Sequence, residues 1–356
     1  MKQKHYNLKS LDSEILDITA IDADTCKIYI VTEKGYLYCY NLTQQQLQQL
    51  SITPLPLPVL NNRELRHYGT PKYQIKCSAN GKFIAVYVDH GQFGVVINTQ
   101  TLETVLHIDS QNYYEDTVSF SLAFAQFNSQ DICIYRSDWN RLEAFNLTTN
   151  QLLTERYIAA YKTEPPKHYL DYFHGALYVS PNNDYILDDG WIWHPVASPK
   201  VWSLSQWFKH NPFESEDGSS VQALCYRENW NAVMCWLDDQ HVAIWNIELW
   251  DQEEFDLKPE PKNRSGIHLL SLAKTTWDDD YSANYWEIPE QTQQVFNLYA
   301  DQNLLIIVGN ENITTYAIAD RILLNQTDNS LPQKQHKSRQ SLLSFTNKTV
   351  YETSYI

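Results

Sequence analysis

The sequence predicts an all-β fold, a single β-propeller made of small four-stranded antiparallel blades. A repeat of about 48 residues, turn residues at hairpin spacing and many strand-forming side chains support this prediction. Aromatic residues make up 13% of the 356 residues, with 24 Tyr and 11 Trp, and such side chains suit the half-buried surface of a sheet. The repeat is what selects a propeller from among the all-β folds.

The repeat is an apolar run that ends in an aromatic or aliphatic residue followed by Asn or a similar residue. Its six copies are Tyr40-Asn41-Leu42, Ile97-Asn98-Thr99, Phe145-Asn146-Leu147, Trp193-His194-Pro195, Trp245-Asn246-Ile247 and Tyr316-Ala317-Ile318. Their middle positions are 57, 48, 48, 52 and 71 residues apart. A propeller blade takes roughly 40–45 residues, so we expect the longer intervals to contain insertions.

Each repeat can be divided into four strands. In the second repeat the strands are expected at residues 73–77, 83–88, 93–97 and 105–108. Asn80-Gly81 lies between the first two, and Asn-Gly is a strong hairpin signal. In later repeats we expect Asp188-Asp189-Gly190 and Asp238-Asp239-Gln240 to form the turns between the second and third strands, because these residues tolerate left-handed conformations.

The repeats are expected at residues 14–50, 72–108, 119–157, 173–207, 221–257 and 293–326. Residues 340–356 carry two more strand-like runs, and Tyr6-Asn7-Leu8 within residues 3–9 echoes Tyr40-Asn41-Leu42. An open blade edge would leave backbone groups unpaired. We therefore expect a seventh blade, shared by both termini, that closes one domain over residues 1–356. A six-bladed ring with the tail packed outside is the alternative.

Tyr40-Asn41, Phe145-Asn146 and Trp245-Asn246 stand where WD40 propellers carry a Trp-Asp pair at the end of the third strand. Over nearly the whole chain the sequence resembles WD40-like β-propellers of a bacterial type with degenerate motifs. The Gly-His step of that family is missing, and His174-Gly175 is the reversed pair. The resemblance implies the fold and brings no activity with it.

Charge and composition limit the classes of partner. The formal net charge is −16, from 27 basic and 43 acidic residues. Such a surface repels phosphate backbones and anionic lipid, so we expect neither nucleic-acid nor membrane binding. No stretch approaches the roughly 18 apolar residues that span a bilayer. Asp12, Glu14 and Asp17 exclude an ordinary signal peptide near the N-terminus, and we expect a cytoplasmic protein.

The sequence contains no catalytic or cofactor signature. Nucleophile elbows, phosphate loops and dinucleotide fingerprints do not occur. The run from Trp277 to Tyr281 includes three adjacent Asp residues, but a calcium loop needs ligands at alternating positions and a Gly at the turn. We therefore predict no metal and no cofactor. The six Cys residues include no Cys-x-x-Cys pair and are expected to be free thiols.

Long connections between blades are expected at residues 51–71, 109–118, 159–172, 209–220, 258–292 and 327–339. In WD40-like propellers these lie on one face with the turns between the second and third strands, and long loops on a rigid scaffold usually carry function. Acidic residues are interleaved there with aromatic ones, among them Tyr113, Tyr114 and Tyr169. The residues predicted to bind a protein are Asp188, Asp189, Asp238, Asp239, Trp277, Asp278, Asp279, Asp280, Tyr281 and Trp286. The alternative for each ring is packing onto the blade beneath it.

The predicted function is that of a non-enzymatic protein, expected to be monomeric, that presents an acidic, aromatic face to a basic partner. One concrete version is an immunity or inhibitor protein that blocks a basic toxin. The first alternative is a metal-dependent lactonase or esterase with Glu33, Asp138, Asp188 and Asp238 at a central channel. The second is a structural scaffold subunit, for which the Gln-rich tract at residues 44–50 would offer a strand edge.

Overall fold

The structure, a computed structural model, describes residues 3–60, 69–192, 196–247, 265–273, 284–289, 294–328, 331 and 333–356. By contacts the chain divides into two compact units. The first unit comprises Met1–Asp109 with Gln293–Ile356, and the second comprises Ser110–Thr292. Each unit is described by itself below.

The fold is all-β, with the seven antiparallel blades that the repeat predicts. The blades of the first unit are β2 (Ile15–Ala20), β3 (Lys27–Thr32), β4 (Leu37–Asn41) and β5 (Gln46–Gln49); β6 (Lys72–Cys77), β7 (Phe83–Asp89), β8 (Phe93–Asn98) and β9 (Thr104–Asp109); β23 (Val295–Asp301), β24 (Leu304–Gly309), β25 (Asn312–Ala317) and β26 (Ile322–Asp328); and β27 (Lys334–His336), β28 (Ser341–Thr346), β29 (Thr349–Ser354) and β1 (Gln3–Asn7). A 3-10 helix, Lys337–Arg339, joins β27 to β28.

The second unit holds the other three blades. They are β10 (Leu122–Phe127), β11 (Gln130–Asp138), β12 (Arg141–Asn146) and β13 (Gln151–Leu152); β14 (Phe173–Val179), β15 (Tyr185–Ile192), β17 (Lys200–Ser203) and β18 (Gln222–Ala223), with β16 (Val196–Ala197) also paired to β15; and β19 (Met234–Trp236), β20 (His241–Trp245), β21 (Gly266–Ser271) and β22 (Tyr285–Glu287). Two short helices, α1 (Leu204–Lys209) and α2 (Glu214–Asp217), lie between β17 and β18. Among the described residues no helix is both long and apolar enough to cross a membrane.

The apolar core of each unit lies between the faces of neighbouring blades. In the first unit Val31 of β3 and Val86 of β7 belong to one buried cluster. In the second unit Ile134 of β11 packs in a cluster with Ile186 of β15 and Trp202 of β17. Because a blade is covered on both faces, its second strand is a continuous apolar run, and β7 is buried along its whole length.

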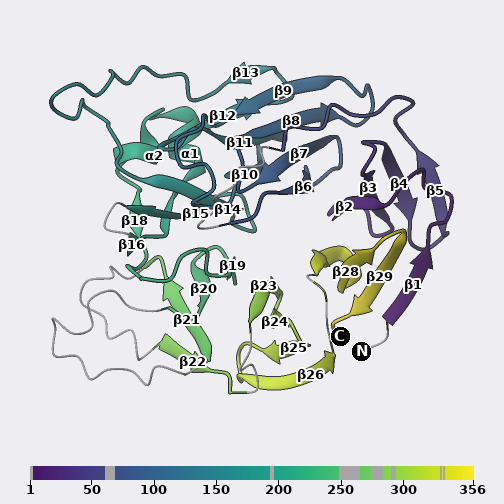
Figure 1. The fold of residues 1–356 in the computed structure, drawn as a ribbon. Helices are drawn as coiled ribbons and strands as arrows, with labels where there is room; N and C mark the ends of the chain where they lie inside the picture. The colour runs from purple at the N-terminus through teal and green to yellow at the C-terminus, as the bar shows by residue number, and fades with distance from the viewer. Residues whose placement is uncertain are drawn as a thin grey trace. The chain divides into compact units, whose positions relative to one another are not determined.

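The last blade is closed by both ends of the chain, as predicted. β1 pairs antiparallel with β29 from Gln3 opposite Thr353 to Asn7 opposite Thr349, and Figure 1 shows both termini at this sheet. The C-terminal hairpin of β28 and β29 lies inside, and β1 is the outer strand. The innermost strand, β27, was not predicted, because it lies within the segment 327–339 that was assigned to a connection.

One predicted turn of the second unit lies inside a strand. Asp188-Asp189-Gly190 is not a turn but the middle of β15, where Asp188 pairs with both Leu177 and Lys200. Gly190 is required there by close approach, since a Cβ would lie 2.2 Å from the Phe173 carbonyl oxygen. Trp193-His194-Pro195 lies outside the described residues.

In the fifth repeat the predicted third strand is in fact the second strand of its blade. Trp245 ends β20, which is the second strand of its blade, and Asp238-Asp239-Gln240 forms the turn between the first and second strands. The third and fourth strands, β21 and β22, lie within the segment 258–292 that was predicted to be a connection. An apolar run followed by Asn can end any strand of a blade, so the local pattern does not fix which strand it closes.

Candidate functional site

Two of the residues predicted to bind a protein are buried inside the second unit. Asp188 is fully buried, and its Oδ2 lies 2.5 Å from His174 Nδ1 while its Oδ1 accepts a 2.9 Å hydrogen bond from the Gly175 N–H. Arg227 donates from Nη2 to the carboxylate of buried Asp189. Their predicted place in an exposed turn is therefore wrong, and they hold the interior of the unit together.

Burial, and to a lesser extent the neighbouring charges, shift the pKa values of ionisable groups around Asp188 and Asp189. Burial raises the pKa of Asp189 to about 6, although the Arg227 guanidinium opposes the rise. Burial also lowers the pKa of Lys200, whose Nζ lies 4.2 Å from the centre of the buried Tyr172 ring. A general acid or base must reach a substrate. Asp188 and Asp189 are closed off from solvent, so neither is placed to act on one in this structure.

Asp238 and Asp239 lie at the surface, in the turn between β19 and β20. Partial burial raises the pKa of Asp238, but hydrogen bonds from the Gln240 N–H and from His241 outweigh it and hold that pKa below its usual value. Asp239 accepts a 2.8 Å hydrogen bond from the Asn182 N–H of the neighbouring blade. Asp238 is therefore the more available of the two to a partner.

The other predicted residues divide into two groups. Trp286 is buried in β22, opposite Ile267. This ring therefore packs within its blade, which was the predicted alternative to partner binding. Trp277, Asp278, Asp279, Asp280 and Tyr281 lie outside the described residues. A partner-binding role for the predicted set stays a prediction.

A stack of aromatic rings in the second unit, here called the aromatic face, runs from a buried cluster to the surface. Tyr113 stacks on Phe173 with ring centres 5.9 Å apart, and Phe173 stacks on Trp191 at 4.4 Å. Trp191 stacks in turn on Trp230 at 4.8 Å. The aromatic face consists of Tyr113, Tyr114, Trp139, Phe173, Trp191 and Trp230.

The stack is buried at its base and open at its end. Phe173 and Trp191 are buried, whereas Tyr113 is 44% exposed and Tyr114 is 50% exposed. The backbone of Tyr114 has a φ of 48°, in the left-handed region that bulky residues seldom adopt. Such conformations cost roughly 1–3 kcal/mol and often mark functional segments. The Thr117 N–H stabilises the turn by donating to the Tyr114 carbonyl at 3.1 Å.

Hydrogen bonds hold the loops of the aromatic face in place. The Trp139 N–H donates to Asp138 Oδ1 at 2.8 Å, and the Trp139 carbonyl accepts from the His174 N–H at 3.0 Å. Asn140 Nδ2 donates to the Leu170 carbonyl at 2.7 Å. The turn between β11 and β12 is thus tied both to β14 and to the connection that precedes β14.

Acidic groups and further tyrosines lie beside the stack. The Tyr161 ring is 5.2 Å from Tyr169, and Tyr161 is exposed. Burial raises the pKa of Tyr169, and nearby charges, Asp171 foremost and Asp138 more weakly, raise it further. Burial raises the pKa of Asp138 as well. Asp138 and Asp171 therefore border the aromatic face on the side of Tyr169.

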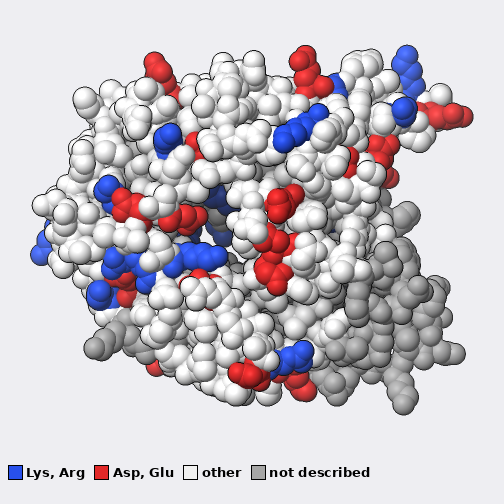
Figure 2. Space-filling view, turned by 180° about the vertical axis from the view of Figure 1, so that it is seen from behind, with Lys and Arg blue, Asp and Glu red and all other residues white. Residues whose placement is uncertain are grey.

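Acidic side chains do not form a continuous patch on the face that Figure 2 shows. On the face that Figure 2 shows, red acidic and blue basic side chains are interspersed among uncharged residues. Several acidic residues of the predicted face are buried, including Glu115, Glu214 and Glu216. Among the described residues no group of three or more His, Cys, Asp or Glu side chains is placed to hold a metal ion.

Sequence reasoning found part of the aromatic face. It placed Tyr113, Tyr114 and Tyr169 among the loop aromatics, but it did not connect them with Trp139, Phe173, Trp191 and Trp230. A signal was present in the sequence, because Trp139 stands in Ser137-Asp138-Trp139-Asn140 and Trp230 in Glu228-Asn229-Trp230-Asn231. Both runs have the composition of turns, where large apolar rings are uncommon. Trp191 gave none, since an aromatic residue near the end of a strand is common.

Comparison with known structures identifies the fold. The structure of U3-55K superposes with a TM-score of 0.55 at 10% identity, covering 98% of both chains. The WD40 repeats of RRP9 give 0.56 at 11% identity, covering 98% of this chain and 97% of theirs. Hydrazine synthase of Kuenenia stuttgartiensis gives 0.57 at 8% identity, with 94% and 93% covered. No family model and no curated protein matches the sequence. The chain thus has the fold of WD40-repeat propellers, as its degenerate motifs predicted.

Proposed function

We propose that this WD40-type propeller is a non-enzymatic binding protein that takes a basic protein partner on the aromatic face of its second unit. The observation that carries the proposal is the ring stack. Its inner rings, Phe173 and Trp191, are buried, whereas Tyr113 and Tyr114 have exposed surface that a partner can contact. Tyr and Trp dominate binding hot spots because they bury much area at little entropic cost.

The chemistry beside the stack favours a cationic contact. A Lys or Arg side chain over a tyrosine ring gains about 0.5–2 kcal/mol, more as water is excluded. Asp138 directly precedes Trp139 in the chain, and both Asp138 and Asp171 lie near Tyr169, where they would pair with that charge. The net charge of −16 would speed the encounter with a basic partner. An inhibitor of a basic toxin is the concrete version we propose, acting in the cytosol as a monomer.

The hydrolase alternative is weaker. It requires Asp188 to face a central channel, whereas Asp188 is fully buried and paired with His174. The scaffold alternative would use another surface, the outermost strand β5 within the Gln-rich tract, and partner binding would then be unaffected by changes in the aromatic face.

The test replaces the exposed end of the stack. Tyr113→Ser with Tyr114→Asn removes both rings while keeping residues that suit the loop, since Asn tolerates a left-handed backbone. Partners are captured from native cytosol at low and high salt and identified by mass spectrometry, and the affinity of the captured protein is then measured. We expect roughly 30-fold weaker binding, equivalent to about 2 kcal/mol.

The matched control is Val59→Ser, which removes an exposed apolar side chain of the first unit. It should bind the partner as the unchanged protein does. Equal binding by the double variant, or a partner whose capture is insensitive to salt, would show that the aromatic face is not the binding surface for a basic protein.

A further inference from the structure

The outer edge of the β23–β26 sheet is unusual among the blades. β26 is the outermost strand of its sheet, and at seven residues it is the longest outermost strand in the described chain. β13 and β18 have two residues each, and β22 has three. Proteins protect sheet edges with short strands, Lys or Pro. β26 contains no Lys and no Pro, and it is not a short strand.

β26 also exposes apolar side chains. Exposed and half-buried residues alternate along the whole strand, and Ile322 and Leu324 are each 56% exposed. A bulge, where Thr315 and Tyr316 face Asn325 and Leu323, leaves Leu324 without a residue opposite it. Beyond the bulge Asn325–Asp328 pairs regularly with β25. The outer edge of β26 thus has two exposed apolar side chains, Ile322 and Leu324, here called the apolar shelf. They are followed by the regularly paired backbone of Asn325–Asp328, here called the straight run.

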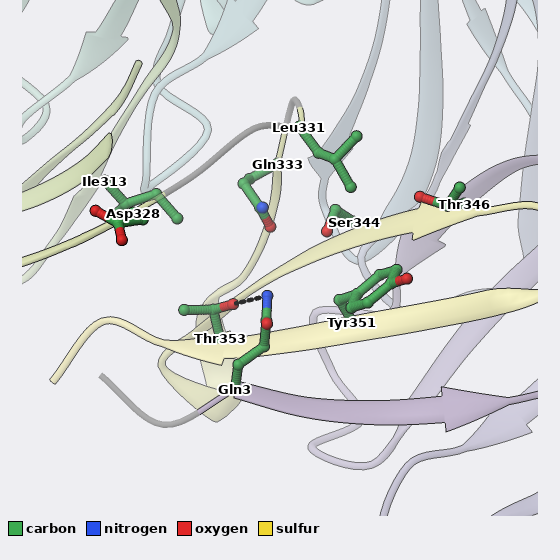
Figure 3. A pocket seen from close by; sticks show the side chains of 9 residues that line it. All are labelled: Gln3, Ile313, Asp328, Leu331, Gln333, Ser344, Thr346, Tyr351 and Thr353. Atoms are coloured by element: carbon green, nitrogen blue, oxygen red, sulfur yellow. Dashed lines mark hydrogen bonds between the residues drawn. The ribbon is translucent and has the colours of Figure 1, made fainter. Parts of the chain in front are cut away.

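The straight run ends at a groove within the first unit. A cavity of about 400 Å³ lies between the β23–β26 sheet and the sheet of β27, β28, β29 and β1. Its lining residues are Gln3, Ile313, Asp328, Leu331, Gln333, Ser344, Thr346, Tyr351 and Thr353. Figure 3 shows the side chains of Gln3, Gln333 and Ser344 directed toward one space.

The groove begins where the apolar packing between the two sheets stops. Ile313 belongs both to the buried cluster there, with Leu342 and Tyr355, and to the groove lining. Ser344 lies opposite Tyr351 on adjacent strands, so both present the same face of their sheet. Apolar side chains would have continued the core, and the polar residues on this face leave an opening instead.

One hydroxyl group in the groove has no hydrogen-bond partner among the described residues. Ser344 is only 2% exposed, and within that part of the chain its hydroxyl oxygen makes no hydrogen bond. Leaving a buried polar group unsatisfied costs roughly 1–3 kcal/mol. Gln3 donates from Nε2 to Thr353 Oγ1 at a long 3.4 Å. These neutral amides and hydroxyls match the donors and acceptors of a peptide group.

The charged residues at the two ends of β26 indicate which net charge a ligand at this edge would carry. Asp328 ends β26 and lines the groove, and exposed Glu311 precedes its opposite residue, Asn312. At the other end exposed Asp320 adjoins Arg321. Three carboxylates against one guanidinium favour a ligand with net positive charge.

We propose that the outer edge of β26 and the groove at its C-terminal end bind an extended basic segment of another polypeptide, which adds a strand to the β23–β26 sheet. Main-chain hydrogen bonds along Asn325–Asp328 supply affinity, as in other strand additions, and side chains at alternate positions rest on Ile322 and Leu324. A cationic side chain meets Asp328, and the groove takes the end of the strand. The inference rests on the proposed function for the basic protein partner but concerns a different surface.

The probe is a synthetic peptide of alternating Lys and Val, about nine residues long, which is enough to span β26. Its twin carries N-methyl groups on the amides of one edge, which removes hydrogen bonds without changing charge. Affinity is measured by calorimetry and protection of β26 by hydrogen exchange. We expect slowed exchange in β26 with the first peptide only, and an affinity at least about tenfold lower for the methylated one.

Two variants locate the site. Ile322→Thr with Leu324→Thr keeps strand-forming residues but removes the apolar shelf, and Ser344→Ala removes the unpartnered hydroxyl without loss of a hydrogen bond in the free protein. Both should weaken the first peptide, whereas Ile52→Thr, at another exposed apolar residue of the first unit, should not.

Equal protection by both peptides would overturn the proposal, as would binding that the β26 variants leave unchanged. A dimer of this chain that the Ile322 and Leu324 replacements disperse would also overturn it, because a second copy would then occupy the edge. The Tyr113 and Tyr114 variant separates this result from the proposed function, since it should leave peptide binding at β26 intact.

Discussion

At the scale of single residues, Arg156 shows how a charge is held inside the second unit. Its side chain is fully buried and donates to Glu143 Oε2 from Nη1 at 2.9 Å and to Glu216 Oε1 from Nε at 3.0 Å. Further donors reach the carbonyls of Thr154 and Leu142. One guanidinium thereby ties β12 to α2 and saturates two buried carboxylates.

Replacing Arg156 with Met should destabilise the protein strongly. The variant leaves Glu216 buried without a countercharge and leaves Glu143 paired with Arg141 alone, and breaking a buried pair this way costs about 3–5 kcal/mol. Urea denaturation at neutral pH measures the loss. Lys27→Met is the matched control, because its pair with Asp24 is exposed and worth about 1 kcal/mol or less. A loss at Arg156 no larger than that control's would contradict the expected role.

At the scale of elements, β1 is the strand that closes the last blade. It covers the edge of β29, and Tyr6 donates from its hydroxyl to Glu352 Oε2 at 2.6 Å. Arg339 donates from Nε to the other oxygen of the same carboxylate at 2.6 Å. The opposed ends of the chain are therefore joined by a buried polar anchor as well as by the backbone ladder.

Deleting residues 1–7 should expose β29 as an unpaired edge. We expect a lower free energy of unfolding and concentration-dependent association, because bare edges pair with other chains. Denaturation and light scattering measure the two effects. Tyr6→Phe is the comparison, since it keeps the ladder and removes one hydrogen bond, at a cost of about 1–3 kcal/mol. A deletion no more harmful than Tyr6→Phe would show that β1 does not close the blade.

At the scale of the whole molecule, buried histidines make stability depend on pH in both units. Burial lowers the pKa of His268 to about 4 in the second unit, and burial lowers that of His336 to about 4 in the first. The unfolded chain binds a proton at each position below a pH of about 6.5, whereas the folded chain does so only near 4. Asp189 acts in the opposite direction, because its folded-state pKa is raised to about 6.

Lowering the pH from about 6.5 to 4 should therefore reduce the free energy of unfolding. Among the described residues, the two histidines act in this direction together with four carboxyl groups whose pKa is lowered, and they oppose three whose pKa is raised. The lowered ones are Asp12, Asp24, Asp238 and Glu352, and the raised ones are Asp189, Asp22 and Asp138. Urea midpoints across this range test the expectation. His268→Phe should flatten the decline by removing one of the two histidines, and the ring still packs beside Tyr285. A flat profile in the unchanged protein, or a stability that rises as the pH falls, would contradict the assignment.

Local sequence patterns predicted most of the strands, many of the turns between them and the closure of the last blade, but not β21, β22 and β27. Those features depend on local physics: residues such as Asn80-Gly81 favour a tight turn, and alternating or continuous apolar runs favour half-buried or buried strands. Tyr6-Asn7-Leu8 carries the same signal, and so β1 could be predicted.

Which charged and aromatic side chains face solvent depends on contacts between distant residues. Asp188-Asp189-Gly190 has the composition of a turn, but His174 and Arg227, distant in sequence, neutralise its carboxylates inside a strand. Tyr113, Phe173 and Trp191 come from three separate segments, and their stack exists only once the blades pack together. Burial and ring stacking are properties of contacts between distant residues, which a local pattern does not contain.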